Sequence, residues 1–286
     1  MDRIAHPPQL PPRPADGHKG MFGRVLVVGG NEEMIGAPVL AGTSALKMGA
    51  GLVQIAVARS ILAACLSITP ELIGLGLRKG VNKVRLLNAA EKADAIVIGP
   101  GLGQSPEAAK RLNCLIRLDK PMVVDADALN LIAAMKKWPP SFKAHAVLTP
   151  HPGEMGRLVK LIGRSEVPTD EPGRIDIATE AARAFGQLIV LKGSRTIVTD
   201  GARLYINDTG DSSLSKAGTG DILSGIIGTL LSQKLNSFDA ATLAVWLHGK
   251  AGEIAGKRLG NRCVLARDVI ESIPAAIAAR ESDNLS

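Results

Sequence analysis

Asp221 ends a glycine-rich turn in the stretch SKAGTGDILSGIIGTLL, residues 215–231. Gly218 and Gly220 precede an apolar helical run, and the free backbone N–H groups at a helix start attract a phosphoryl oxygen or a developing negative charge. A carboxylate at such a point repels phosphate unless it accepts a proton from a hydroxyl nucleophile or helps to hold a divalent cation. An ordinary helix cap is the alternative, and spacing alone favours the cap.

Two further turns carry polar side chains suited to the same chemistry. Lys192 ends an apolar run in LKGSRT, with Arg195 close behind, so its ammonium and the neighbouring amides could meet phosphates. A solvated hairpin charge is the alternative for Lys192. His151 lies between two prolines in TPHPGE, which fixes its backbone, although it could equally cap a helix starting near Glu154.

The glycine-rich turns do not match the common nucleotide-binding motifs. GPGLG, residues 99–103, lacks the spacing of a dinucleotide fingerprint. GNEEMIGA, residues 30–37, lacks the lysine and hydroxyl pair of a P-loop. A conventional Rossmann dehydrogenase and a P-loop kinase are therefore disfavoured.

These turns follow short apolar runs that alternate with helical segments, which predicts a mainly parallel sheet with helices on both faces. Ligands bind beyond the carboxyl ends of the strands in such sheets, so the turns should converge on one site. The predicted strands are RVLVVGG (24–30), LVQIAVA (52–58), AIVIGPG (95–101), PMVVDAD (121–127), HAVLTPHPG (145–153) and QLIVLKG (187–193).

The C-terminal half adds a hairpin and several helices. RTIVTDG and RLYIND flank an Asp200-Gly201 turn, which predicts an antiparallel edge of the sheet. His248, on an alanine-rich helix, is predicted to be a packed core residue rather than a ligand. An exposed loop is expected at 163–175, and helices are expected at 36–49, 178–185, 221–231, 237–256 and 267–280.

The amino-acid composition limits the class of ligand and the domain organisation that we expect. The 286 residues are 46% hydrophobic and carry a net charge of +7, but only 2% are aromatic, which disfavours a base-stacking nucleic-acid platform and leaves small phosphorylated ligands as the better match. Residues 7–14 hold five prolines and predict an extended arm outside the packed core. We therefore expect an arm over 1–17 and a single domain over 18–286.

The three cysteines, Cys65, Cys114 and Cys263, are far apart in the sequence. This spacing predicts buried, reduced thiols rather than disulfides or a zinc site. The N-terminus lacks the apolar core of a signal peptide, and no apolar run of about 18 residues could span a bilayer. We expect a soluble, cytoplasmic protein that binds neither membranes nor nucleic acid.

Together the motifs resemble one family. HKGMFGRVLVVGG, GAPVLAGTSALKMGAGLV, IGPGLG, VVDADALN, LTPHPGE, LKGSRT and AGTGDILSGII occur in an order similar to that of the ribokinase-like ADP-dependent NAD(P)H-hydrate dehydratases, from His18 to Ala279. The resemblance implies a three-layer α/β/α sandwich. It also implies a lyase that dehydrates (6S)-NADHX and (6S)-NADPHX to NADH and NADPH and releases AMP and phosphate from ADP.

The resemblance also implies roles for individual residues. Asp221 matches the catalytic base, and Gly218 and Gly220 match the anion hole. The residues matching the nucleotide site are Lys192, Gly193, Ser194, Arg195, Thr196 and Gly220. The residues matching the hydrated-dinucleotide site are Ala37, Gly101 or Gly103, His151 and Asp221, with Asp125 and Asn130 lining the same mouth.

Several expectations concern partners and alternatives. Phosphoryl transfer implies Mg²⁺, for which no protein ligand is assigned. ADP is favoured over ATP, and relatives commonly form homotetramers. Because about 17 residues precede the dehydratase segment, we expect a separate epimerase to supply the S isomer. The alternatives are a ribokinase-like kinase of a hydroxymethyl pyrimidine or hydroxyethyl thiazole, and a regulatory nucleotide-binding protein without turnover.

Overall fold

The computed structural model describes residues 1–78 and 83–282. Its strands form one sheet in the order β1-β10-β9-β8-β7-β6-β5-β2-β3-β4. The strands are β1 (Asp2–Arg3), β2 (Arg24–Val28), β3 (Leu52–Ala58), β4 (Ile73–Leu77), β5 (Ala95–Ile98), β6 (Pro121–Val124), β7 (His145–Leu148), β8 (Leu188–Leu191), β9 (Ile197–Thr199) and β10 (Arg203–Ile206).

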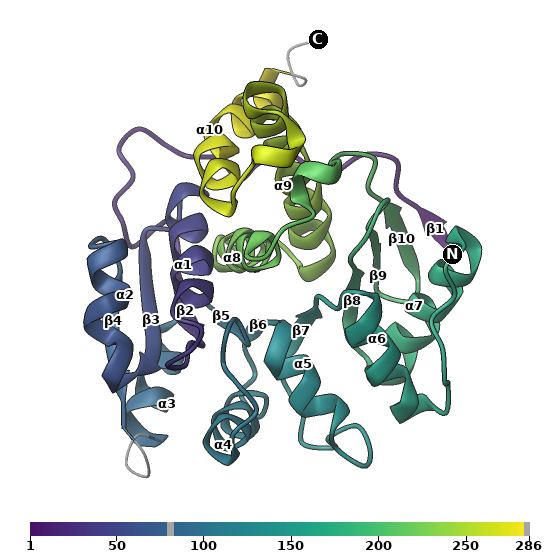
Figure 1. Cartoon of the computed structure of the whole chain (residues 1–286), viewed down its shortest axis with the longest axis horizontal. Helices are drawn as coiled ribbons and strands as arrows, with labels where there is room; N and C mark the ends of the chain where they lie inside the picture. Colours follow the sequence, from purple (N-terminus) through teal and green to yellow (C-terminus); the bar gives the residue numbers. More distant parts are fainter. Residues whose placement is uncertain (79–82, 283–286) are drawn as a thin grey trace.

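Helices cover both faces of this sheet, which makes three layers (Figure 1). α1, α2, α8, α9 and α10 pack on one face, and α3 to α7 pack on the other. The helices are α1 (Gly36–Lys47), α2 (Leu62–Ile68), α3 (Lys83–Lys92), α4 (Pro106–Leu115), α5 (Ala126–Ala133), α6 (Pro152–Leu158), α7 (Glu171–Phe185), α8 (Thr219–Ser232), α9 (Ser237–Leu259) and α10 (Ala266–Ser282).

Alternate residues of each central strand supply the two cores. In β2, Val25 and Val27 face the layer that contains α8, whereas Leu26 and Val28 face the opposite layer. All four side chains are buried, as expected for a parallel strand covered on both faces. The apolar runs that predicted the strands therefore reflect burial on both sides.

The predicted sheet is confirmed. All six predicted runs contain strands, and β8-β7-β6-β5-β2-β3 is parallel throughout. The hairpin is confirmed too, because β9 pairs antiparallel with both β8 and β10. β4 was not predicted, because its sequence IGLGL contains two glycines and so has a weak strand signal.

The predicted loop at 163–175 was wrong in its second half. α7 begins at Glu171, because the Asp170 carboxylate caps it by accepting a hydrogen bond of 3.0 Å from the Gly173 N–H. Pro172 occupies the first turn, where its missing N–H costs nothing. The sequence Asp170-Glu171-Pro172 is a local signal for this helix start.

The N-terminal arm is extended, but it packs against the domain rather than staying outside the core. β1 pairs parallel with β10, and Pro7 is buried. The Arg280 guanidinium donates to the Pro7 carbonyl at 2.5 Å, and Arg13 lies over the Phe22 ring. Residues 1–17 thus cover the sheet edge at β10 and part of the α10 surface.

The strand order reverses between β2 and β5, because the chain moves outward from β2 through β3 to β4 and then returns to β5 on the other side. The turns after β2 and β5 consequently lie side by side at the carboxyl edge of the sheet. They are in direct contact, because the Gly30 N–H donates to the Pro100 carbonyl at 2.9 Å. The switch point therefore lies between two of the glycine-rich turns.

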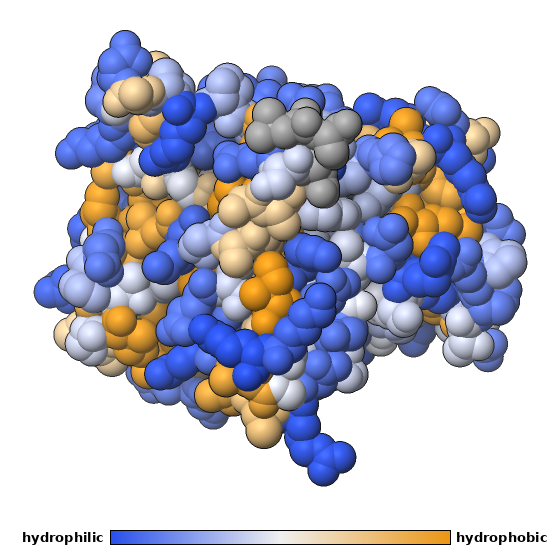
Figure 2. Space-filling model, turned by 90° about the horizontal axis from the view of Figure 1, so that it is seen from above, coloured by the Kyte–Doolittle hydropathy of each residue, from blue (hydrophilic) through white to orange (hydrophobic). Residues whose placement is uncertain are grey.

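The surface seen from above in Figure 2 is largely hydrophilic, with separate apolar patches. Among the described residues, no helix has the length and hydropathy needed to cross a bilayer. The cysteines are free thiols, as expected, but only Cys65 is buried. Cys114 is half-buried and Cys263 is exposed, so the prediction that all three are buried was wrong.

The close approach of α8 to α1 depends on Gly225. A Cβ at this position would collide with the Ala41 carbonyl oxygen and the Ser44 hydroxyl. We expect Gly225→Ala to lower the free energy of unfolding by about 1–3 kcal/mol. Gly156→Ala, in the open surroundings of α6, should instead leave stability unchanged or raise it by up to about 1 kcal/mol. Urea unfolding of both variants tests this contact, and equal effects would contradict it.

Candidate active site

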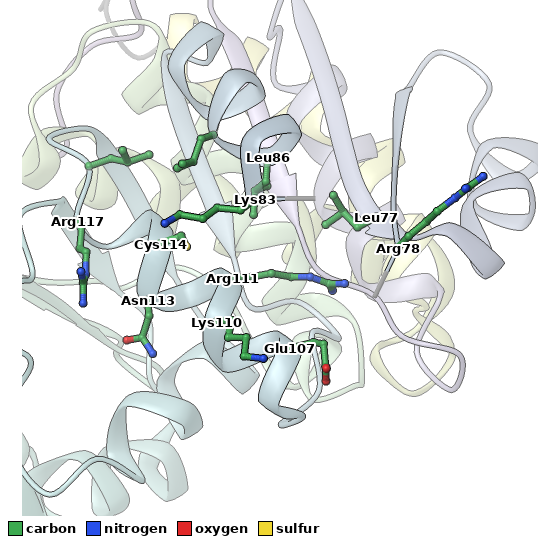
Figure 3. Close-up of a pocket in the computed structure, with 12 residues that line it drawn as sticks. Leu77, Arg78, Lys83, Leu86, Glu107, Lys110, Arg111, Asn113, Cys114 and Arg117 are labelled. Carbon is green, nitrogen blue, oxygen red and sulfur yellow. The ribbon is translucent and has the colours of Figure 1, made fainter. Parts of the chain in front are cut away.

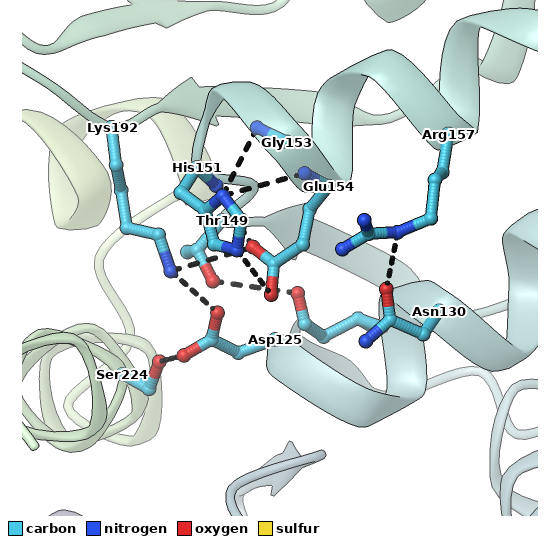
Figure 4. Close-up of polar contacts among 10 residues, drawn as sticks. Asp125, Asn130, Thr149, His151, Gly153, Glu154, Arg157, Lys192 and Ser224 are labelled. Carbon is cyan, nitrogen blue, oxygen red and sulfur yellow. Dashed lines mark hydrogen bonds and ion pairs between the residues drawn. The ribbon is translucent and has the colours of Figure 1, made fainter. Parts of the chain in front are cut away.

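Three neighbouring strands deliver charged side chains to one point. Asp125 follows β6, Glu154 lies in the first turn of α6 after β7, and Lys192 follows β8. Figure 4 shows the three side chains converging, with Ser224 of α8 facing Asp125 from the other layer. The carboxyl edge of the sheet thus holds a compact polar cluster.

An ion pair forms the centre of this cluster. Lys192 Nζ lies 2.9 Å from Asp125 Oδ1 and 3.8 Å from Glu154 Oε2, while the Ser224 hydroxyl donates to Asp125 Oδ2 at 2.6 Å. Burial alone raises the pKa of the Asp125 carboxyl, but the Lys192 charge and the Ser224 hydrogen bond outweigh it, so its pKa is lowered. Burial alone lowers the pKa of Lys192, but Asp125 and Glu154 outweigh it, so its pKa is raised. The pair is therefore ionised.

The negative charge of Glu154 is less stabilised than that of Asp125. Burial raises its pKa, Lys192 opposes this, and the Asp125 charge adds to the rise. Only 6% of the Glu154 side chain is exposed, so water does little to stabilise its negative charge. One ammonium thus serves two buried carboxyl groups.

Asp221 lies beside this ion pair at the start of α8. A Cβ added at Gly220 would lie 3.5 Å from Lys192 Nζ, so the glycine before Asp221 borders the ammonium. Burial and the Asp125 charge raise the pKa of Asp221 to about 8, against a smaller lowering effect of Lys192. A carboxyl group with this pKa can exchange a proton near neutral pH.

Asp221 is not the cap of α8. The N-cap is Gly218, with φ +91°, and no side chain caps the helix. Among the described residues, the Gly220 and Asp221 N–H groups donate to no backbone carbonyl, so they are free to meet an anion. The positive φ of Gly218 favours glycine at this position, and an added Cβ would lie 2.7 Å from Leu40 Cδ1 and 3.1 Å from the Ala266 Cβ. The geometry therefore excludes the capping role for Asp221.

The predicted nucleotide loop follows Lys192 and is held by α7. Arg174 donates to the Ser194 carbonyl at 2.8 Å, and the Thr196 hydroxyl donates to the Gly193 carbonyl at 3.0 Å. Gly193 has φ +144°, a conformation that favours glycine. Arg195 is ion-paired with Glu171, so its charge is directed to α7 rather than to Lys192. The backbone of residues 193–196 and the Lys192 ammonium are what this loop offers to phosphates.

The predicted substrate side lies at the switch point. Ala37 is at the start of α1, and a Cβ added at Gly101 would lie 3.1 Å from the Ala37 Cβ, so the two positions are neighbours. The Asn31 amide donates to the Gly101 carbonyl at 3.1 Å, and the Gly103 N–H donates to Asp127 Oδ2 at 2.8 Å. The GPGLG turn is thus fixed between two polar side chains.

His151 caps α6, as one of its two interpretations proposed. Its Nδ1 accepts hydrogen bonds from the Gly153 and Glu154 N–H groups at 3.0 and 3.4 Å, and the Glu154 carboxylate accepts one from the His151 N–H at 2.8 Å. Its side chain remains 51% exposed, so the ring can also contact a ligand. Asn130 lies farther along α5, where it accepts a hydrogen bond of 2.8 Å from Arg157 Nε. Of the predicted dinucleotide contacts, Asp125, His151 and Asp221 thus lie at the ion-pair cluster. Ala37, Gly101 and Gly103 lie at the switch point, and Asn130 lies outside both groups.

His248 is buried in α9, as predicted, and lies close to the site. Burial lowers its pKa to about 4, against a contact with the Thr219 backbone, so the ring is neutral. Its Nε2 has no hydrogen-bond partner within the described chain. The sequence pattern did not indicate that this residue packs behind the first turn of α8.

Two members of the cluster were missed by the sequence analysis. Ser224 lies three residues after Asp221 on α8, a spacing that places both on one face of the helix and could have identified it. In the sequence, Glu154 indicates only the start of a helix. Its role depends on the distance between the ends of β7 and β8, which no local pattern contains. No group of three or more possible metal-ligating side chains is found within residues 1–78 and 83–282.

A separate cavity of about 650 Å³ lies between α3 and α4 (Figure 3). Its walls combine leucines with Lys83, Lys110, Arg111 and Arg117, and Glu107 is the acidic residue at its edge. None of the residues predicted to carry chemistry lines this cavity. The converging carboxylates, not the size of the cavity, therefore mark the candidate active site.

The raised pKa of Asp221 has a consequence for stability. Its folded pKa of about 8 exceeds the ordinary value of 3.8, so the folded state loses stability relative to the unfolded state as pH rises from about 4 to 8. We expect Asp221→Asn to raise the melting temperature by about 2–8 °C at pH 9, which corresponds to about 1–2 kcal/mol, and to change it little at pH 4. Thermal unfolding at both pH values tests this.

Asp94→Asn is the matched control, because its effect should have the opposite sign. Burial raises the pKa of Asp94, but Lys234 and the Arg24 N–H outweigh it and lower the pKa overall. The Asp94→Asn variant should therefore melt below the unaltered protein at pH 9. A melting temperature of Asp221→Asn that is the same as that of the unaltered protein at pH 9 would contradict the raised pKa.

Comparison with known proteins agrees with this arrangement. Residues 25–275 match the family model Carb_kinase, described as NAD(P)H-hydrate dehydratase. A bifunctional NAD(P)H-hydrate repair enzyme Nnr from Moorella thermoacetica is 39% identical over 96% of this chain, but the chain spans only 53% of that protein. This chain thus covers about half the length of the curated relatives it matches.

Solved structures are similar over the whole fold. An ADP/ATP-dependent NAD(P)H-hydrate dehydratase from Bacillus subtilis, co-crystallised with ATP and Mg²⁺, has a TM-score of 0.80 and 31% identity, covering 95% of each chain. A ribokinase-like superfamily protein from Enterococcus faecalis has a TM-score of 0.81 and 26% identity, covering 98% of this chain and 96% of its own. The fold is ribokinase-like, and the chain belongs to the NAD(P)H-hydrate dehydratase family.

Proposed function

We propose that the protein repairs hydrated nicotinamide nucleotides by ADP-dependent dehydration of (6S)-NADHX and (6S)-NADPHX to NADH and NADPH, with release of AMP and phosphate. The observation that carries the proposal is the position of Asp221, a carboxyl group with a pKa of about 8, beside free N–H groups and the Lys192 ammonium. Membership of the dehydratase family supports the choice of substrate.

In the first step, the ring hydroxyl of the substrate attacks the terminal phosphoryl group of ADP. Asp221 accepts the hydroxyl proton, and AMP leaves. The N–H groups at the start of α8 and Lys192 stabilise the negative charge that accumulates on the phosphoryl oxygens. Asp125 and Glu154 hold Lys192 at this point.

In the second step, the new phosphate ester breaks down. Hydroxide is a poor leaving group, whereas phosphate is a good one, so the first step makes dehydration possible. The lone pair of the ring nitrogen expels phosphate, and the neighbouring ring carbon then releases a proton to restore the reduced ring. The overall change is loss of water from the substrate coupled to hydrolysis of ADP, which makes the enzyme a lyase.

Mg²⁺ belongs to the proposal as the companion of the nucleotide. It would neutralise charge on the phosphates. Lys192 already pairs with Asp125 and Glu154, and no three-residue ligand group is found in the described part of the chain, so nucleotide oxygens and water would supply most ligands. The Bacillus subtilis structure with ATP and Mg²⁺ supports this cofactor, and its description as ADP/ATP-dependent keeps ATP as a second possible donor.

The main alternative is a ribokinase-like kinase that phosphorylates a small alcohol and releases the ester. It would use the same aspartate and the same anion hole, so Asp221 does not separate the two functions. The family match favours dehydration. A nucleotide-binding protein without turnover is disfavoured, because the base, the ammonium and the free N–H groups are all in place.

We expect the purified protein to restore the absorbance of the reduced ring when given (6S)-NADHX, ADP and Mg²⁺. Asp221→Asn should lower kcat on the order of 10²–10⁴-fold, because it removes the base, while nucleotide binding in a thermal-shift assay is retained. Phosphorylation of hydroxyethyl thiazole without dehydration would favour the kinase. Full activity of Asp221→Asn would remove this residue from the mechanism.

The pH dependence of kcat/KM should report the Asp221 carboxyl. Because the base must be ionised, kcat/KM should fall as pH drops below about 8. Asp125→Asn removes a negative charge that raises the pKa of Asp221, so the acid limb should move to lower pH even though kcat/KM also falls. Glu107→Gln, in the separate cavity, is the control and should leave the profile unchanged. An acid limb that moves upward in Asp125→Asn would contradict this electrostatic coupling.

A further inference from the structure

A smaller cavity of about 460 Å³ lies beside the candidate active site. It is formed by α5, by α6 with the short turn after it, and by the loop that follows the GPGLG motif. Two of its lining side chains, Arg157 and Lys160, are cationic, and two, Gln104 and Asn130, are amides. Its lining residues are Gln104, Asn130, Ala133, Ala134, Arg157 and Lys160.

The cavity is joined to the active site by the helices that build both. Glu154 and Arg157 are three residues apart on α6, about one helical turn, and Asn130 lies on α5, which begins directly after Asp125. Figure 4 shows Arg157 directed toward Asn130, next to the cluster around Asp125 and His151. A ligand extending outward from His151 along α6 would therefore reach Arg157 first.

The Arg157 side chain is held in place by a hydrogen bond, but no carboxylate among the described residues pairs with its charge. Its Nε donates to Asn130 Oδ1 at 2.8 Å, which fixes the guanidinium plane. Within the described residues, its Nη atoms and the Lys160 ammonium have no hydrogen bond or ion pair. The two terminal NH2 groups of the guanidinium remain free, in the fork geometry that binds phosphate oxygens.

The charge of the inner site creates a need for such a cation. Asp125, Glu154 and Asp221 supply three carboxyl groups around a single ammonium, that of Lys192. A hydrated dinucleotide carries a diphosphate, and its phosphorylated form carries a further phosphate on the ribose. These groups would be repelled by the carboxylates, so their binding requires positive charge outside the inner cluster.

We propose that the cavity at Arg157 and Lys160 binds a phosphate group of the dinucleotide substrate, with the Arg157 fork as the main contact. This inference rests on the proposed function. The phosphate could be the diphosphate, which both substrates carry, or the ribose phosphate, which only NADPHX carries. The guanidinium would bind either phosphate group through the same contacts. A comparison of NADHX with NADPHX distinguishes the diphosphate from the ribose phosphate.

Steady-state kinetics of Arg157→Gln with each substrate tests the proposal. Loss of a charged hydrogen-bond donor should raise KM by about 10- to 100-fold, with kcat changed less than about twofold. A rise with both NADHX and NADPHX assigns the diphosphate, whereas a rise with NADPHX alone assigns the ribose phosphate. KM within about twofold of the unaltered protein for both substrates would overturn the proposal.

Three further variants separate charge from structure. Arg157→Lys keeps the charge but loses the fork, so it should recover part of the affinity. Lys160→Gln should raise KM less than Arg157→Gln. Arg164→Gln is the matched control, because Arg164 pairs with Glu180 outside the cavity, and it should leave KM unchanged. A KM rise in Arg164→Gln equal to that of Arg157→Gln would indicate a general charge effect and reject the site.

Binding of NADPH and NADH, measured by calorimetry, makes the test independent of turnover. The unaltered protein should bind at least one of them about 10- to 100-fold more tightly than Arg157→Gln does. If the unaltered protein shows no dehydration, the proposed function fails, but weaker binding to Arg157→Gln still supports the cavity. Equal binding to both proteins, or no binding to either, rejects it.

Discussion

The ion pair between Lys192 and Asp125 is the interaction on which the site depends. Asp125 has 1% of its surface exposed, and its charge can be kept only because the ammonium lies 2.9 Å away. Loss of either partner leaves a buried charge uncompensated, which typically costs about 3–5 kcal/mol. The same ammonium is the positive charge nearest to Gly220 and is attracted by the Asp221 carboxylate. Fold stability and the chemistry of the site therefore share one cation.

The backbone around this pair is strained at two points. Ala126, directly after Asp125, has φ +50°, and Arg195, three residues after Lys192, has φ +53°. Residues with a Cβ rarely adopt this conformation, which costs on the order of 1–3 kcal/mol. Hydrogen bonds from the Gly103 N–H to Asp127 and from Arg174 to the Ser194 carbonyl hold the two turns in place. Strain at both partners of the ion pair is consistent with turns shaped for binding rather than for stability.

The sequence was sufficient to predict those elements whose structure depends on a local pattern. Continuous apolar runs predict the buried strands, because both faces of a covered parallel strand are apolar. The Asp200-Gly201 turn predicts the hairpin. Asp221 could be placed at a helix start for the same reason. Glu154 could not be paired with Lys192, because the two residues are 38 positions apart in the chain and their proximity depends on the pairing of β7 with β8. The raised pKa of Asp221 likewise results from burial and from carboxylates on other elements, which no local pattern encodes.

The two sides of the site are built differently. On the Lys192 side, charged side chains that follow β6, β7 and β8 converge on a small volume. On the switch-point side, the GPGLG turn is largely buried and packs directly against other backbone. A Cβ at Gly99 would collide with the Asp125 carbonyl oxygen, and a Cβ at Gly101 would lie 2.8 Å from the Met34 carbonyl oxygen. The glycines of this turn therefore allow the close approach that holds Asp125, one partner of the central ion pair, against the end of β5.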